Sequence, residues 1–135
     1  MKKVLTMILC VTLILTFFTS TVSAASEGIS PRFNNANATD SNFLILGGEA
    51  IVSLSYSGKS GYFTSAKITT VLEKRTLLLF WSDVTEWTDT STSANGSFNH
   101  TYPVDSGTYR VKITYEISGT GGATDVIEET IKASS

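Results

Sequence analysis

The sequence predicts an all-β protein built from two antiparallel sheets that pack face to face, and three observations lead to this prediction. Between Tyr109 and Ile117, apolar side chains at odd positions alternate with polar ones at even positions, as in a strand with one buried and one solvated face. About seven strand-like runs are separated by turn residues roughly every 8 to 12 positions, which is typical of an antiparallel sandwich. No helical periodicity is found after residue 25.

The segment from Met1 to Ala24 has the layout of a secretory signal peptide. Lys2 and Lys3 precede an apolar run from Val4 to Phe18, and small residues follow just before Ala25. The run is shorter than the about 20 residues that a membrane-spanning helix needs. We therefore expect a cleaved signal-peptide helix over residues 1–24, no stable membrane anchor after cleavage, and a bacterial protein that is secreted, extracellular or cell-wall associated.

Composition limits the partners of the mature chain, by which we mean residues 25–135. Its formal net charge falls from −2 to −4 once Lys2 and Lys3 are removed. No basic patch is evident, so we expect no nucleic-acid partner, and anionic membrane surfaces are disfavoured. The only cysteine, Cys10, lies in the apolar run, so the mature domain is cysteine-free and packing alone must stabilise it.

The first part of the mature chain is polar and then turns into strands. Residues 25–40 are rich in Asn, Ala and Ser, which predicts a flexible leader ahead of a β-sandwich domain over residues 41–135. Residues 43–46 and 49–56 are expected to form two strands that meet at a pair of glycines. The next strand is expected over residues 66–75.

The stretch from Thr76 to Trp87 is the most apolar part of the mature chain. Its run from Leu77 to Trp81 is too long to be buried in a two-layer core, so part of it should be exposed or packed against a partner. Residues 88–97 are expected to form a polar loop that turns at Asn95-Gly96. Strands are then predicted over 98–102, 109–117 and 125–132.

The entry to the strand at Tyr109 carries a resemblance. Asp105-Ser106-Gly107-Thr108-Tyr109 resembles the tyrosine corner of immunoglobulin-like sandwiches, in which a half-cystine follows two residues after the tyrosine. Val111 stands at that position, so the disulfide of antibody-type domains is absent. The resemblance implies an immunoglobulin-like sandwich in which Asp105, Gly107 and Tyr109 have a structural role.

A broader resemblance covers roughly residues 66–117. The layout is similar to small secreted proteins of Gram-positive bacteria that carry a domain of unknown function. The shared features are Leu72-Glu73-Lys74, the segment from Trp81 to Trp87, and an ending with Phe98, Tyr102 and Gly107 to Val111. That family has no assigned activity, so the resemblance implies a fold and no mechanism.

The inventory of reactive side chains argues against an enzyme, a metal site or a bound cofactor. His100 is the only histidine, whereas a zinc site needs three or four Cys or His ligands. Asp83, Glu86 and Asp89 fall close together, but no calcium-binding loop motif surrounds them. His100 shares a strand side with Phe98 and so resembles a packing residue more than a general base.

Large apolar residues near loops are the candidate interaction surface. They are Tyr62, Phe63, Leu77, Leu79, Phe80 and Trp81. Exposed aromatic residues commonly anchor proteins or carbohydrates, although these side chains could instead close the open ends of the sandwich. We therefore expect a non-enzymatic binding or interaction module for an unknown protein or cell-wall carbohydrate. The alternatives are a small secreted hydrolase or hydrolase inhibitor, and a toxin- or immunity-type factor.

Overall fold

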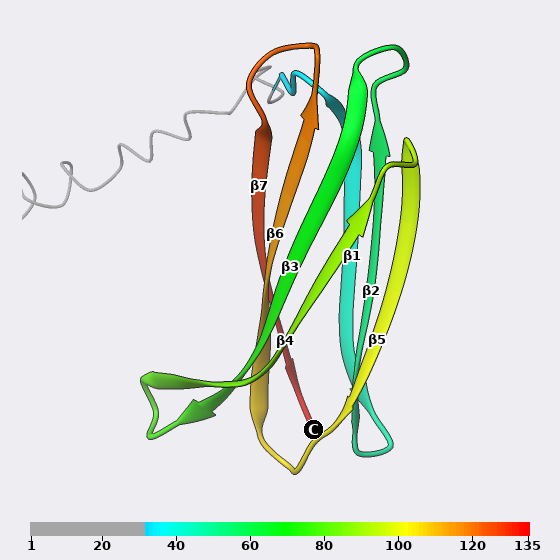
Figure 1. Cartoon of the computed structure of the whole chain (residues 1–135). Coiled ribbons are helices and arrows are strands. Elements are labelled where there is room, and N and C mark those ends of the chain that lie inside the picture. The colour runs from blue at the N-terminus through cyan, green and yellow to red at the C-terminus, as the bar shows by residue number, and fades with distance from the viewer. Residues whose placement is uncertain (1–31) are drawn as a thin grey trace, which may run out of the picture. The chain divides into compact units, whose positions relative to one another are not determined.

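The computed structural model describes residues 32–135, and the predicted signal peptide and start of the leader lie outside these residues. The described residues form seven strands (Figure 1). Their bounds are β1 (Ala36–Leu46), β2 (Glu49–Gly58), β3 (Phe63–Thr76), β4 (Phe80–Ser91), β5 (Asn95–Pro103), β6 (Thr108–Gly119) and β7 (Asp125–Ser134). Within this part of the chain, no helix is long and apolar enough to cross a membrane.

The strands form two antiparallel sheets that lie over one another as layers. One sheet has the order β1-β2-β5, and the other has the order β4-β3-β6-β7. The prediction of an all-β, two-sheet fold of about seven strands is therefore confirmed.

The hydrophobic core lies between the two sheets, and β6 contributes its largest share. The five apolar residues at odd positions from Tyr109 to Ile117 are each at most 2% exposed. The polar residues between them are more exposed. The alternation in the sequence therefore correctly predicts which side of the strand is buried. The other buried apolar residues are Ala36, Phe43, Ala50, Val52, Leu54, Tyr56, Ala66, Ile68 and Leu72.

The predicted flexible leader over residues 25–40 is wrong at its end, because β1 already begins at Ala36. Asn35 and Ala36 are 0% and 1% exposed. The carboxylate of Asp125 accepts hydrogen bonds from the backbone amides of Asn34, Asn35 and Ala36, at 2.8, 2.6 and 2.8 Å. These hydrogen bonds supply partners for the buried backbone amides of this segment. The domain therefore begins several residues before position 41.

The predicted loop over residues 88–97 is also wrong. β4 continues to Ser91 and β5 begins at Asn95, which places Asn95-Gly96 inside a strand. A side chain on Gly96 would clash with the ring of Tyr56 on the neighbouring strand. Gly96 is therefore needed for close packing against an aromatic ring rather than for a turn.

Candidate functional site

The turn between β3 and β4 carries the most exposed apolar group in residues 32–135. Leu77, Leu78, Leu79 and Phe80 are 84%, 81%, 81% and 65% exposed, and we call these four residues the hairpin tip. Figure 1 shows the β3–β4 hairpin bending away from the sandwich near one end. Leu77, Leu79 and Phe80 were predicted from the sequence as interaction residues. Leu78 lies in the same turn and is equally exposed. Exposed apolar groups of this kind are more common at interaction sites than on the rest of a protein surface, which makes the tip the candidate site.

The backbone of the hairpin tip is strained. Leu77 and Leu78 have φ angles of 45° and 53°, and they are the only residues other than glycine with positive φ in the described part of the chain. The left-handed conformation costs about 1–2 kcal/mol for each such residue, and Asn-Gly is the usual choice for two in succession. The Leu79 amide donates to the Leu77 carbonyl, and Arg75 Nε donates to the Leu78 carbonyl at 2.6 Å. Strain of this kind tends to persist at functional sites.

Trp81 lies behind the tip and is only partly exposed. Two cations, from β6 and β7 of the same sheet, lie over its ring. The guanidinium carbon of Arg110 lies 4.3 Å from the ring centroid, and Lys132 Nζ lies 5.7 Å from it. Trp81, predicted from the sequence as a possible interaction residue, thus stacks with cations of its own chain.

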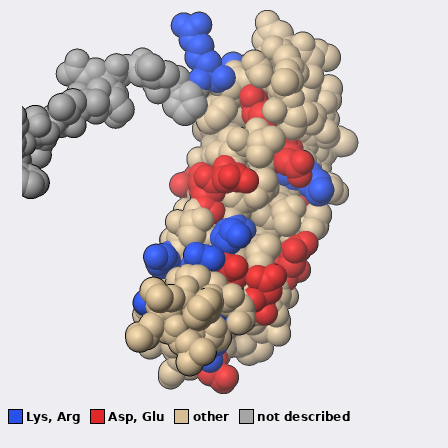
Figure 2. Space-filling view, turned by 90° about the vertical axis from the view of Figure 1, so that its left-hand side faces the viewer, with Lys and Arg blue, Asp and Glu red and all other residues tan. Residues whose placement is uncertain are grey.

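Arg75, Arg110 and Lys132 form a basic collar behind the tip. Figure 2 views this hairpin end-on and shows Lys and Arg side chains beside a protruding knob of uncharged residues, with Asp and Glu side chains next to them. Glu73 is buried under the collar, where Arg110 Nε donates to its carboxylate at 2.5 Å. This hydrogen bond holds the pKa of Glu73 below its ordinary value, even though burial opposes the shift.

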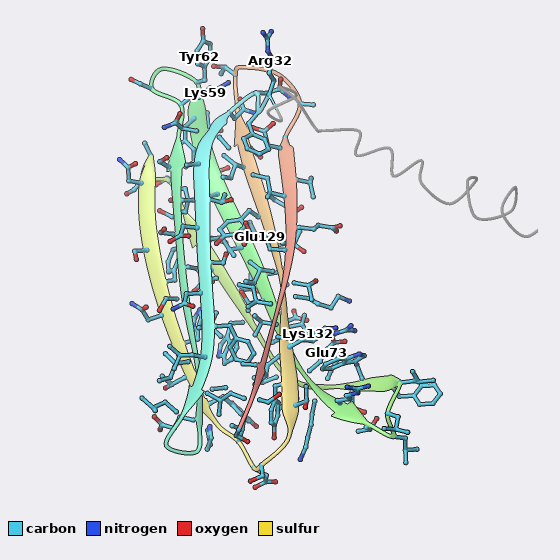
Figure 3. All side chains as sticks on the ribbon, turned by 180° about the vertical axis from the view of Figure 1, so that it is seen from behind. Arg32, Lys59, Tyr62, Glu73, Glu129 and Lys132 are labelled. Atoms are coloured by element: carbon cyan, nitrogen blue, oxygen red, sulfur yellow. The ribbon has the colours of Figure 1, made fainter. Side chains whose placement is uncertain are left out.

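The structure separates the other two candidate residues from the hairpin tip. Tyr62 is 51% exposed and lies at the opposite end of the sandwich from Glu73 and Lys132 (Figure 3). Phe63 is partly buried, and its ring stacks on Tyr56 with 5.8 Å between centroids. The six residues therefore do not form one surface, and Phe63 packs against the core.

The corner between β5 and β6 holds the residues of the tyrosine-corner motif. The Tyr109 hydroxyl donates to the carbonyl oxygen of Asp105 at 3.0 Å, and Tyr109 is 2% exposed. Gly107 has a φ of 155°, and the Lys74 side chain lies against it. These contacts fix the entry to the central strand of the core, and they are structural.

His100 forms a polar tie between the two sheets. Its Nε2 lies 2.6 Å from Asp89 Oδ2, and its ring stacks on Trp87 with 4.9 Å between centroids. The side chains of His100 and Asp89 are only 18% and 13% exposed. Asp89 thus points away from the exposed Asp83 and Glu86. Within residues 32–135, no group of three or more His, Cys, Asp or Glu side chains could hold a metal ion.

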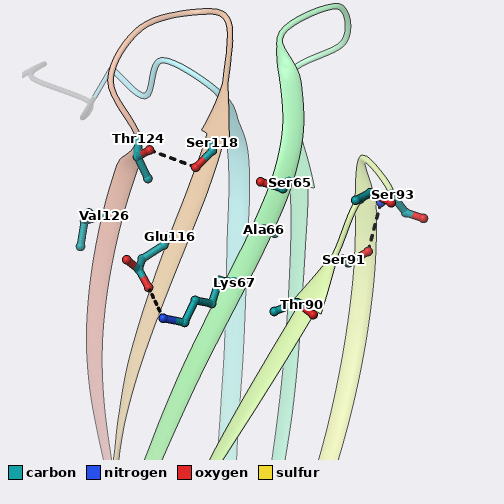
Figure 4. A pocket seen from close by; sticks show the side chains of 11 residues that line it. Ser65, Ala66, Lys67, Thr90, Ser91, Ser93, Glu116, Ser118, Thr124 and Val126 are labelled. Carbon is teal, nitrogen blue, oxygen red and sulfur yellow. Dashed lines mark hydrogen bonds and ion pairs between the residues drawn. The ribbon is translucent and has the colours of Figure 1, made fainter.

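A shallow hollow of about 730 Å³ lies on the outer face of the β4-β3-β6-β7 sheet (Figure 4). The ion pair between Lys67 and Glu116, at 3.5 Å, crosses it, and both side chains are substantially exposed. Hydroxyl groups line the rest, including those of Ser65, Thr90, Ser91, Ser118 and Thr124. The described residues that line this hollow include no aromatic ring and no buried charge, so it offers fewer recognition features than the hairpin tip.

Comparisons with known proteins return only distant structural similarities. No family model matches the chain, and no curated protein matches it. Two crystal structures of OgpA from Akkermansia muciniphila are 10% identical, with a TM-score of 0.46, and cover 77% of this chain. Spo0M, a sporulation control protein from Bacillus subtilis, is 10% identical, with a TM-score of 0.39 and 76% coverage. The chain spans 30–31% of the OgpA chains and 51% of Spo0M.

Proposed function

We propose that the protein is a secreted, non-enzymatic binding module of the immunoglobulin-like sandwich type, which engages its partner through the hairpin tip. The observation that carries this proposal is the tip itself. Four neighbouring large apolar side chains are exposed on a backbone that costs free energy to maintain. The secreted location rests on the predicted signal peptide over residues 1–24.

Two features support the immunoglobulin-like assignment. The strand order keeps β2 with β5 in one sheet and β3 with β6 and β7 in the other, as immunoglobulin domains keep strand B with E and strand C with F and G. The bond from Tyr109 to Asp105 has the donor and acceptor of a tyrosine corner at the equivalent strand connection. β4 pairs with β3 in this chain rather than joining the smaller sheet.

The arrangement of ionisable groups supports a non-enzymatic role. The buried carboxylates in residues 32–135 are Glu73 and Asp125, which bind Arg110 and three backbone amides respectively. They also occupy different places, since Glu73 lies near the hairpin and Asp125 begins β7 next to Asn35. A glycosidase needs two carboxyl groups within about 5–10 Å across a cleft, so these two carboxylates give the hydrolase alternative no support.

The test is a binding comparison between two matched variants. The mature chain from Ala25 is suitable because it contains all the core residues found in the described part of the chain. Leu79→Asp adds a charge at the tip, whereas Val126→Asp adds the same charge at another exposed apolar residue, 59% exposed on β7. Leu79→Asp should leave the thermal unfolding midpoint nearly unchanged, because exposed turn positions tolerate substitution. Val126→Asp places a carboxylate opposite Glu116 and should lower the midpoint slightly without unfolding the domain.

Immobilised wild type should retain components of cell-wall and membrane fractions from a Gram-positive bacterium, and Val126→Asp should retain them equally well. Leu79→Asp should retain at least tenfold less, because a carboxylate cannot enter an apolar contact without a partner. Equal retention by all three proteins would show that the hairpin tip is not the binding site.

A further inference from the structure

We propose that the hairpin tip docks reversibly on a lipid bilayer containing anionic lipids, with its leucines at the acyl boundary and the basic collar among the headgroups. This inference rests on the proposed function and names the partner of the same site. Three properties of the hairpin lead to it: its convex shape, its internally bonded turn, and the order of residue types behind the tip.

The tip is a projection, and a bilayer accepts a projection without a matching groove. A specific protein interface usually involves about 20–30 residues on each side, whereas the tip offers four exposed residues. Two copies meeting tip to tip would also bring their basic collars together, and like charges repel. Apolar side chains that enter the headgroup and acyl boundary gain free energy in proportion to the apolar area buried.

The backbone of the tip already has internal partners for two of its carbonyl groups. The Leu77 carbonyl accepts from the Leu79 amide, and the Leu78 carbonyl accepts from Arg75. These bonds matter at a bilayer, because backbone polar groups that leave water without a partner are costly there. An ordinary solvated turn has less need of them.

From the tip toward the sandwich, the hairpin changes from apolar to aromatic to basic residues. A bilayer changes in the same order, from its acyl interior through the interface to the anionic headgroups. The leucines and Phe80 come first, Trp81 follows, and the collar cations lie over the Trp81 ring. Tryptophan favours the membrane–water interface, and Lys and Arg favour anionic headgroups. In Figure 3, Lys132 lies close to the base of this hairpin.

The distribution of charge resolves an apparent conflict with composition. The chain as a whole is acidic, and its overall composition disfavours anionic membranes. At the base of the hairpin, however, the three collar cations face two carboxylates, those of Glu73 and Asp83. Glu73 is buried and bonded to Arg110, which leaves Arg75 and Lys132 against the exposed Asp83, an excess of one positive charge beside the tip. This modest local excess fits weak, reversible docking rather than permanent anchoring.

Vesicle flotation tests this inference with the mature chain. Vesicles of phosphatidylcholine alone are compared with vesicles of equal parts phosphatidylcholine and phosphatidylglycerol. Wild type should float with the anionic vesicles, Leu79→Asp should lose at least tenfold in partitioning, and Val126→Asp should match wild type. Lys132→Gln should lose about fivefold on anionic vesicles only, which is the effect of one cation near an anionic surface.

Trp81 provides a second readout. Trp87→Phe leaves Trp81 as the only tryptophan, and its emission should shift to the blue when anionic vesicles are added. No flotation and no shift, together with tip-dependent binding to another component of the cell fractions, would overturn the lipid assignment and leave the proposed function standing. If neither assay showed binding that depends on the hairpin tip, both the lipid assignment and the proposed function would be wrong. A dimer seen by sedimentation velocity, abolished by Leu79→Asp in the absence of vesicle binding, would identify a second copy as the partner instead.

Discussion

At the scale of single residues, Asp125 shows how one side chain fixes the start of the domain. Burial raises the pKa of its carboxyl group, but the backbone hydrogen bonds from Asn34, Asn35 and Ala36 and the charge of Lys59 outweigh burial, so the pKa lies below its ordinary value. The charged form is therefore favoured by folding. Its contribution to stability is present above the unfolded-state pKa of about 3.9 and is lost as the pH falls through the folded-state pKa.

Asp125→Asn should lower the free energy of unfolding by about 1–3 kcal/mol at pH 7, because one amide oxygen replaces two carboxylate oxygens for three N–H groups, of which those of Asn35 and Ala36 are buried. Urea unfolding from pH 7 down to pH 2 measures the effect. The difference from wild type should shrink as the pH falls, since the wild-type carboxylate becomes protonated. A difference that stayed constant over this range would mean that the charge of Asp125 contributes nothing.

The same residue explains why the start of the domain could not be predicted. Asn35 and Asp125 are 90 positions apart, and nothing in the local run of Asn and Ala residues indicates that its amides are buried. Gly96 is a second case, because its partner Tyr56 lies on another strand. Local sequence patterns predict the alternation of buried and exposed residues well, but they do not predict contacts between segments that are far apart in the sequence.

At the scale of elements, the β3–β4 hairpin combines a predictable feature with an unpredictable one. The length of the apolar run from Leu77 to Trp81 exceeds what a two-layer core can bury, so the exposure of part of it follows from sequence. The cations that cover Trp81 could not be predicted in this way, because Arg110 and Lys132 come from β6 and β7. Their positions depend on the strand register rather than on neighbouring residues.

Replacing Leu77-Leu78 with Asn-Gly should stabilise the hairpin. Both residues have positive φ, which Asn and Gly adopt at much lower cost than leucine. We expect the free energy of unfolding to rise by about 1–2 kcal/mol, measured by urea denaturation at pH 7. A double variant with Ala at both positions is the control, since alanine removes the same apolar groups without relieving the strain, and it should not be stabilised.

At the scale of the whole molecule, polar side chains tie the two sheets together on either side of the apolar core. His100 on β5 binds Asp89 on β4. Tyr115 on β6 binds Ser41 and the Asp40 carbonyl on β1, at 2.6 and 3.0 Å. Burial raises the pKa of Tyr115 to about 12, so this second tie is retained through neutral and mildly alkaline pH. The two ties flank the core formed by the inner faces of the sheets.

Removing one partner of the partly buried pair of His100 and Asp89 should cost more stability than removing both. His100→Phe retains an aromatic ring to stack on Trp87 but leaves Asp89 without its partner, so we expect a loss of about 1–3 kcal/mol. Combining it with Asp89→Leu should recover most of that loss. Thermal and urea unfolding of the two single variants and the double variant form the cycle, and additive losses would show that the contact is not a coupled pair.

We propose that the strained, exposed leucines of the hairpin tip are kept for binding at the expense of stability. The most direct test measures unfolding free energy and binding to phosphatidylglycerol-containing vesicles and cell-envelope fractions on one variant, Leu77→Asn with Leu78→Gly. We expect opposite changes, with the free energy of unfolding raised by about 1–2 kcal/mol and binding reduced at least tenfold. A variant that is more stable and binds as well as wild type would contradict this proposal.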